Sequence, residues 1–160
     1  MLRDFKIQRA VLTQINGSGE KRVNVEECYG KIGENYAEVI RLFKTDERII
    51  KYFKLMQKDA NLDAVCKALE QSDYETAFRA AHTLKGLALN MRFTALANEA
   101  SELTELLRSK EANGNILPLL SKTKRTYQTI LACIDICLKN TAEGSLGHEN
   151  SRYDFNCRRR

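Results

Sequence analysis

A stripe of small and apolar residues in the middle of the chain limits the possible folds more than any other pattern. Steps of four, three, four and three residues separate Ala77, Ala81, Leu84, Ala88 and Met91. This spacing is that of one face of an α-helix, and a face rich in alanine lets neighbouring helices approach closely. The stripe therefore predicts a long central helix, from about residue 73 to residue 91, packed inside a helical bundle.

Helical patterns also fill the rest of the chain between residues 23 and 140. Short connections separate them, and short connections favour antiparallel neighbours. The expected helices cover about 25–31 and 36–44, a stretch that opens at Asp46, a stretch from Leu62 to Leu69, about 94–108, and a last helix with Pro118 in its first turn. The expected fold is all-α: an up-and-down antiparallel four-helix bundle with additional short N-terminal helices.

Polar residues mark two of the helix starts. Asn24 directly precedes the first helical pattern, and asparagine is a good N-cap. Ser72 is followed three residues later by Glu75, which is the capping-box spacing. We therefore expect Asn24 to cap the first helix and Ser72 to open the central one.

The two ends of the chain differ in composition from its middle. Residues 1–22 hold five Lys or Arg against two Asp or Glu, and residues 141–160 are polar and end in three arginines. We expect an N-terminal extension over 1–22 that is flexible or weakly helical, a bundle over 23–140, and a disordered tail over 141–160. Most of the net charge of +5 lies in the two ends. This distribution argues against a basic nucleic-acid-binding domain.

The cysteines and the apolar runs exclude further classes. There are five cysteines, and most lie in apolar helical patterns, which favours reduced, buried thiols over a disulfide framework. Cys133 and Cys137 lie one helical turn apart, but no CxxC pair or nearby histidine completes a metal site. No apolar run approaches the roughly 18 residues of a membrane-spanning helix. We therefore expect a cytoplasmic protein without metal, cofactor or membrane contact.

A second face of the central helix carries residues suited to phosphoryl chemistry. Phe78, His82, Lys85, Gly86 and Leu89 form the stripe beside the small apolar one, displaced by about 100°. His82 should therefore border the core and face outward. An imidazole is mostly neutral near pH 7, so a ring nitrogen has a lone pair with which to attack phosphorus. Lys85 can offset the negative charge that a phosphoryl group adds.

Gly86 lowers the stability of the central helix but leaves His82 accessible. Glycine in a helix interior is less favourable than alanine by about 1 kcal/mol. With no Cβ beside His82, the active site of a partner protein can approach the ring. Phe78 and Leu89 would give this approach an apolar rim, and Arg108 from the next helix is a candidate charged contributor.

The segment Ala81–Met91 resembles the phosphoacceptor motif of the histidine-containing phosphotransfer (HPt) family, which reads H-x-x-K-G followed by small residues. The chain as a whole resembles stand-alone bacterial members of that family. The resemblance implies that His82 is the phosphoacceptor and that Lys85 supports the phosphoryl group. It also implies two-component partners, namely a response regulator receiver domain and a sensor histidine kinase, hybrid kinases included.

Two positions depart from the family pattern. Arg92 stands where the family often has glycine, and a left-handed conformation there would cost something like 1 kcal/mol. Thr104 stands where many members carry a glutamine that hydrogen-bonds to the histidine ring. The threonine side chain is shorter, so the orientation of His82 would depend on water or on another group.

Two other functions compete with phosphotransfer. A helical adaptor would bind a receiver domain or another signalling partner without being phosphorylated on His82. An enzyme is disfavoured, because the sequence has no P-loop, no glycine-rich ATP lid, no HExxH and no Ser or Cys nucleophile set with His and Asp. We therefore expect a phosphotransfer protein without its own ATP site. The second histidine, His148, lies in the polar tail and receives no role.

Overall fold

The computed structural model describes residues 24–109 and 114–145, and within these ranges the regular structure is entirely helical. Its helices are α2 (Val25–Ile32), α3 (Tyr36–Phe43), α4 (Asp46–Met56), α5 (Asn61–Glu70), α6 (Tyr74–Asn90), α7 (Thr94–Leu107) and α8 (Ile116–Ser145). The predicted all-α class is confirmed. None of the helices in these two ranges is long and apolar enough to cross a membrane.

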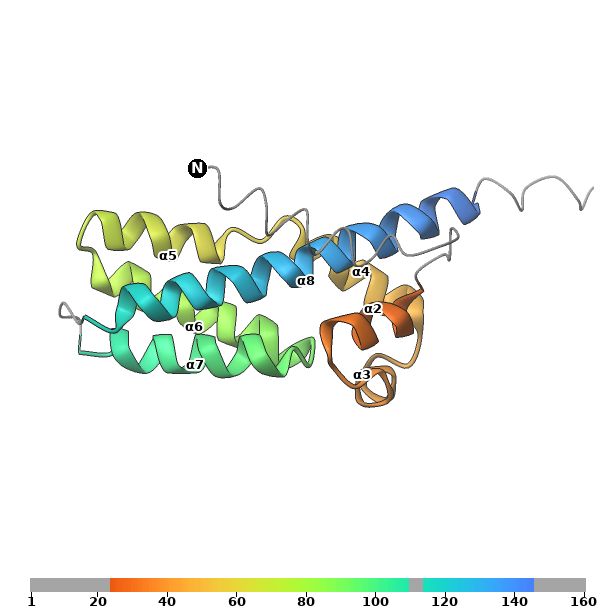
Figure 1. Ribbon diagram of the computed structural model, residues 1–160, viewed down its shortest axis with the longest axis horizontal. Coiled ribbons are helices and arrows are strands. Elements are labelled where there is room, and N and C mark those ends of the chain that lie inside the picture. The colour runs from red at the N-terminus through yellow and green to blue at the C-terminus, as the bar shows by residue number, and fades with distance from the viewer. Residues whose placement is uncertain (1–23, 110–113, 146–160) are drawn as a thin grey trace, which may run out of the picture.

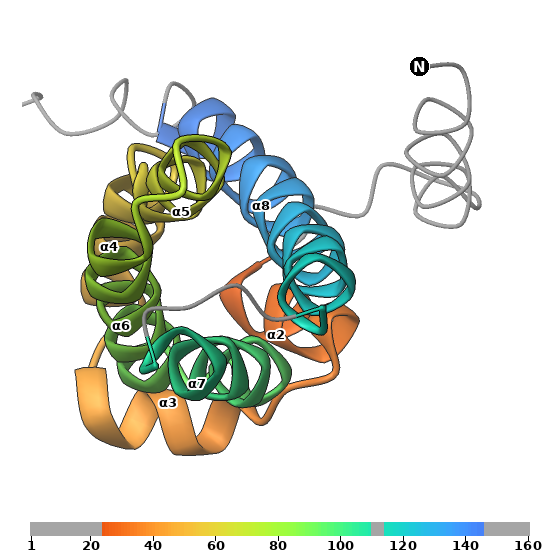
Figure 2. The same cartoon turned by 90° about the vertical axis from the view of Figure 1, so that its left-hand side faces the viewer.

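Helices α5, α6, α7 and α8 form the bundle. Seen from its end, they surround a common core, with α6 between α5 and α7 (Figure 2). The short helices α2, α3 and α4 gather at one end, where α2 and α4 pack against the C-terminal part of α8 (Figure 1). This is the expected four-helix bundle with additional short N-terminal helices.

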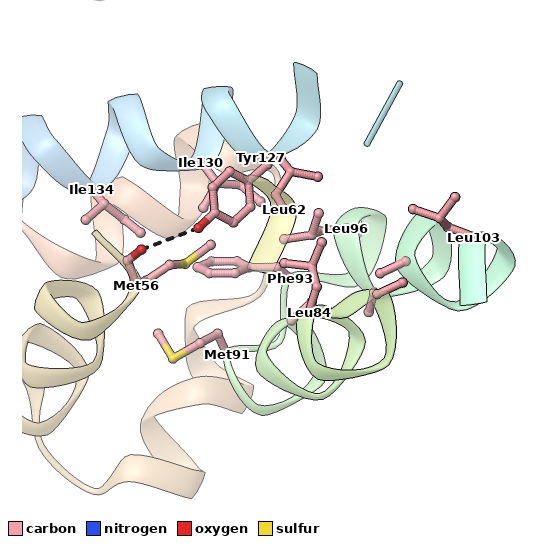
Figure 3. Close-up of a cluster of buried hydrophobic side chains, with 14 of the residues drawn as sticks. Met56, Leu62, Leu84, Met91, Phe93, Leu96, Leu103, Tyr127, Ile130 and Ile134 are labelled. Atoms are coloured by element: carbon pink, nitrogen blue, oxygen red, sulfur yellow. Dashed lines mark hydrogen bonds between the residues drawn. The ribbon is translucent and has the colours of Figure 1, made fainter. Parts of the chain in front are cut away.

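The central helix buries the stripe that the sequence predicted. Ala77, Ala81, Leu84, Ala88 and Met91 are each 0% exposed. Figure 3 shows the large side chains of this core, which come from α4, α5, α6, α7, α8 and the turn between α6 and α7: Met56, Leu62, Leu84, Met91, Phe93, Leu96, Leu103, Tyr127, Ile130 and Ile134. Each such side chain contributes about 1.5–3 kcal/mol when fully buried. Packing in this core therefore holds the buried face of α6 in place.

Tyr29 packs the N-terminal helices against the end of α6. Its ring is fully buried and stacks on Phe53 and Phe93, with ring centroids 5.8 and 5.5 Å away. Its hydroxyl donates to the carbonyl oxygen of Met91 at 3.1 Å. Burial raises the pKa of the Tyr29 phenol well above its usual range, so the group stays a neutral donor.

One of the two capping predictions is confirmed and the other is wrong. Asn24 accepts a hydrogen bond from the backbone N–H of Glu27 at 2.8 Å. At the start of α6, the cap is Asp73, which accepts from the N–H of Thr76 at 3.0 Å. Ser72 has a φ of 56° and belongs to the left-handed turn that closes α5. The backbone of Ser72 therefore ends α5 and does not begin α6.

The last helix runs to Ser145, past the expected bundle boundary at residue 140. The predicted extension over 1–22 and the tail beyond residue 145 lie outside the described residues. Cys28, Cys133 and Cys137 are buried free thiols between α2 and α8, and Cys66 is a half-buried one. Within the described ranges, no group of three or more His, Cys, Asp and Glu side chains is placed to hold a metal ion.

The turn after α6 has the left-handed residue that the sequence suggested. Arg92 has a φ of 58°, and the chain then returns through a hydrogen bond from the N–H of Phe93 to the oxygen of Ala88 at 3.0 Å. This geometry closes helices and favours glycine. The strain at Arg92 arises because its Cβ crowds the backbone in this conformation.

We expect Arg92→Gly to raise the free energy of unfolding by about 0.5–1 kcal/mol, because glycine adopts this conformation without strain. Urea unfolding followed by circular dichroism measures the change. Arg92→Ala is the matched control, since alanine removes the same long side chain but keeps the strained Cβ. Equal stability of the two variants would show that the gain does not come from the backbone.

Candidate functional site

Helix α6 holds His82 near its middle, on the side away from the core. The helix is 17 residues long, is capped by Asp73, and buries Ala77, Ala81, Leu84 and Ala88 on its core face. The side chain of His82 is exposed, as the periodicity predicted. Within residues 24–109 and 114–145 it is the sole histidine. A rigid helix therefore presents one imidazole to solvent.

The structure gathers the predicted site residues around this ring. The ring of Phe78, one turn before, lies 6.3 Å from the imidazole between centroids and is tilted by 32°. Lys85 and Gly86 are half-buried and follow at the helical spacings that make side chains neighbours. Leu89 is 51% exposed at the far end of the stripe. The face thus combines a nucleophile, a cation and two apolar groups.

Gly86 opens onto free space. A Cβ added there would meet no atom within 4 Å outside its own helix neighbourhood. A glycine that permits close packing of two helices would show the opposite result. The glycine is therefore not required for close helix packing within the described bundle. The absence of a side chain leaves the surface beside His82 open.

Arg108 reaches the site from α7. The carbon of its guanidinium lies 5.8 Å from the centroid of the Phe78 ring, which is within cation–π range. Two hydrogen bonds of 2.8 Å, from Nε and from Nη2, join this guanidinium to the two carboxylate oxygens of Glu105. Arg108 therefore lies beside the histidine face, as predicted, but with its charge partly engaged.

Glu105 is a residue of the site that the sequence reasoning missed. The hydrogen bond from Arg108 lowers the pKa of this carboxyl, and the charges of Arg108 and Lys85 lower it further. Its partner Arg108, which lies over the Phe78 ring, places Glu105 at the edge of the histidine face. The sequence could have indicated this residue, because Glu105 lies three residues before Arg108 and this spacing puts both side chains on one side of the helix.

Thr104 does not take the part of the family's glutamine. It is 1% exposed, and its hydroxyl donates to the carbonyl oxygen of Ala100 at 2.6 Å, inside its own helix. The rotation of α7 turns position 104 into the core and brings position 105 to the surface. The hydroxyl proton of Thr104 is therefore not directed at the imidazole of His82.

The fold and this face define a class: a helical bundle whose central helix displays one histidine beside a cation and a glycine. Residues 55–133 match the family model described as Hpt domain, and the chain belongs to this family of histidine-containing phosphotransfer proteins. The matched range runs from the end of α4 into α8 and contains the whole His82 face. Comparisons with curated proteins and with solved structures gave no match. Membership assigns the chain to phosphotransfer in phosphorelay signalling.

Proposed function

We propose that this protein is a phosphorelay intermediate that accepts a phosphoryl group on His82. It passes the group between a histidine kinase or receiver domain and a response regulator, in the cytoplasm of a bacterial cell. The observation that carries this proposal is the exposed imidazole of His82 on a helix whose other face is fully buried. The open surface at Gly86 gives a partner protein room to reach the ring.

The chemistry needs little from this chain beyond a well-placed nucleophile. The lone pair of a neutral imidazole nitrogen attacks the phosphorus of an aspartyl phosphate on the partner. The nitrogen–phosphorus bond forms as the phosphorus–oxygen bond breaks, and the aspartate leaves as a carboxylate with the bonding electrons. The proton on the other ring nitrogen stays in place. Reversal of the same step passes the group onward.

Lys85 supports this exchange through its charge. The transferred group carries about two negative charges near neutral pH. An ammonium one helical turn away offsets part of that charge while the partner's own groups disengage. Phe78 and Leu89 supply apolar contact area around the ring, and Arg108 adds a second cation at the edge of the face.

The direct test is phosphoryl transfer in solution. The full chain is incubated with receiver domains that carry a labelled aspartyl phosphate, and label on this chain is measured before and after acid treatment. We expect label that acid removes, since a phosphorus–nitrogen bond is acid-labile. Stable binding of receiver domains without any transfer of label would instead identify the chain as a non-phosphorylated adaptor and overturn the proposal.

Lys85→Ala should slow phosphoryl transfer or shorten the half-life of the phosphorylated form by about two- to tenfold, the range expected for a partly exposed charge. Rapid-quench kinetics and decay of the label measure both quantities. Lys67→Ala removes a lysine from an exposed position of another helix, α5, and is the control. Kinetics equal to wild type in Lys85→Ala would show that this lysine is an ordinary surface residue.

A further inference from the structure

The histidine face contains an anion where the proposed reaction delivers negative charge. Glu105 accepts hydrogen bonds from Arg108 on both carboxylate oxygens. Arg108 in turn lies over Phe78, whose ring lies beside that of His82. The guanidinium at the edge of the histidine face is therefore already paired with a carboxylate before any phosphoryl group arrives.

We infer that Glu105 shifts the phosphoryl-transfer equilibrium, by competing with the phosphoryl group on His82 for Arg108. This inference rests on the proposed function of His82. Glu105 takes no part in the bonds that form and break; it is a positioning residue that acts through Arg108. Its effect is to make the phosphorylated form of this chain less stable relative to the phosphorylated receiver.

The competition follows from charge and position. Once the imidazole nitrogen has taken the phosphoryl group and the aspartate has left, about two negative charges occupy the same face as the Glu105 carboxylate. The like charges repel, and the guanidinium is still held by two short hydrogen bonds. A carboxylate here therefore favours release of the phosphoryl group to a partner, which is a useful bias in an intermediate that must not retain it.

The pair has little to do with stability of the fold. The side chains of Arg108 and Glu105 are 62% and 55% exposed, and ion pairs of this kind contribute little to folding. Removing the carboxylate should therefore leave the bundle intact. A change in phosphotransfer can then be read without interference from unfolding.

The experiment compares Glu105→Gln with the wild-type full chain in equilibrium with a phosphorylated receiver domain. We expect the equilibrium constant to shift toward phosphohistidine by roughly two- to fivefold, the scale of an exposed charge interaction. The half-life of the isolated phosphorylated form should lengthen. The shift should shrink in 1 M salt, where charges are screened within about 3 Å. A merely structural role would show no such salt dependence.

Two further variants locate the effect. Glu102→Gln removes an equal charge from an exposed position one turn away on α7, and its equilibrium constant should stay near that of wild type. In an Arg108→Gln background, the effect of Glu105→Gln should fall, because no guanidinium is left to release.

The outcomes separate this inference from the proposed function. A wild-type chain that takes no label overturns both. A labelled wild type whose equilibrium constant is unchanged in Glu105→Gln overturns the role of Glu105 alone. An equal shift in Glu102→Gln would assign the effect to net charge and likewise overturn it.

Discussion

His82→Gln is expected to reduce phosphoryl acceptance to background while the protein keeps its fold. His82 is exposed, and its neighbours Ala81 and Leu84 are the side chains that fill the core. Glutamine removes the nucleophilic ring without opening a cavity and tolerates a helix well. Acid-labile label measures acceptance, and the melting temperature with far-ultraviolet circular dichroism measures the fold.

The other histidine of the chain supplies the control. His148→Gln changes the same residue type outside the described helices and should accept label at the wild-type rate. Acid-labile label that persists on His82→Gln would mean that another residue is the acceptor, and the assignment of the site would be wrong.

Gly86→Leu should lower the rate of transfer from a receiver domain more than tenfold, since the added side chain stands where the partner must pass. The protein itself should remain folded, because the space above Gly86 is open. Leucine is a better helix former than glycine, so the free energy of unfolding should hold or rise by about 0.5–1 kcal/mol. Transfer kinetics and urea unfolding, measured on the same preparation, test both parts.

Gly30 offers a matched control on another helix. It lies within α2, is exposed, and likewise has no atom within 4 Å of an added Cβ. Gly30→Leu should therefore give a similar stability change with wild-type transfer. If Gly86→Leu also transferred at the wild-type rate, partners would not approach His82 across this glycine.

The bundle was predictable because the apolar residues of its helices recur at regular helical spacing. The predicted stripe of α6 is buried at every position, and α7 likewise buries a stripe at helical spacing: Leu96, Ala100, Leu103 and Leu107. Periodicity determines which side of a helix is buried, since apolar area removed from water dominates the packing energy. The same rule predicted that His82 would be exposed at the edge of the core.

Features that depend on a choice between neighbouring residues were not predictable. Ser72 and Asp73 are both good caps, and the choice was made by how α5 ends, which the capping pattern does not describe. Thr104 and Glu105 differ by about 100° around α7. Which of them faces His82 depends on the rotation of that helix against α6, and family spacing alone pointed to the buried one.

The contacts of Tyr29 bear on what counts as the folding unit of this protein. Phe93 and the end of α6 are covered by a tyrosine from α2, which lies well before the range matched by the family model. A fragment cut to that range would expose an aromatic ring and leave the Met91 carbonyl without its partner. Local opening of α2 should thus loosen the helix that carries the phosphoacceptor. We therefore expect the cooperative folding unit to extend beyond the range matched by the family model and to include α2.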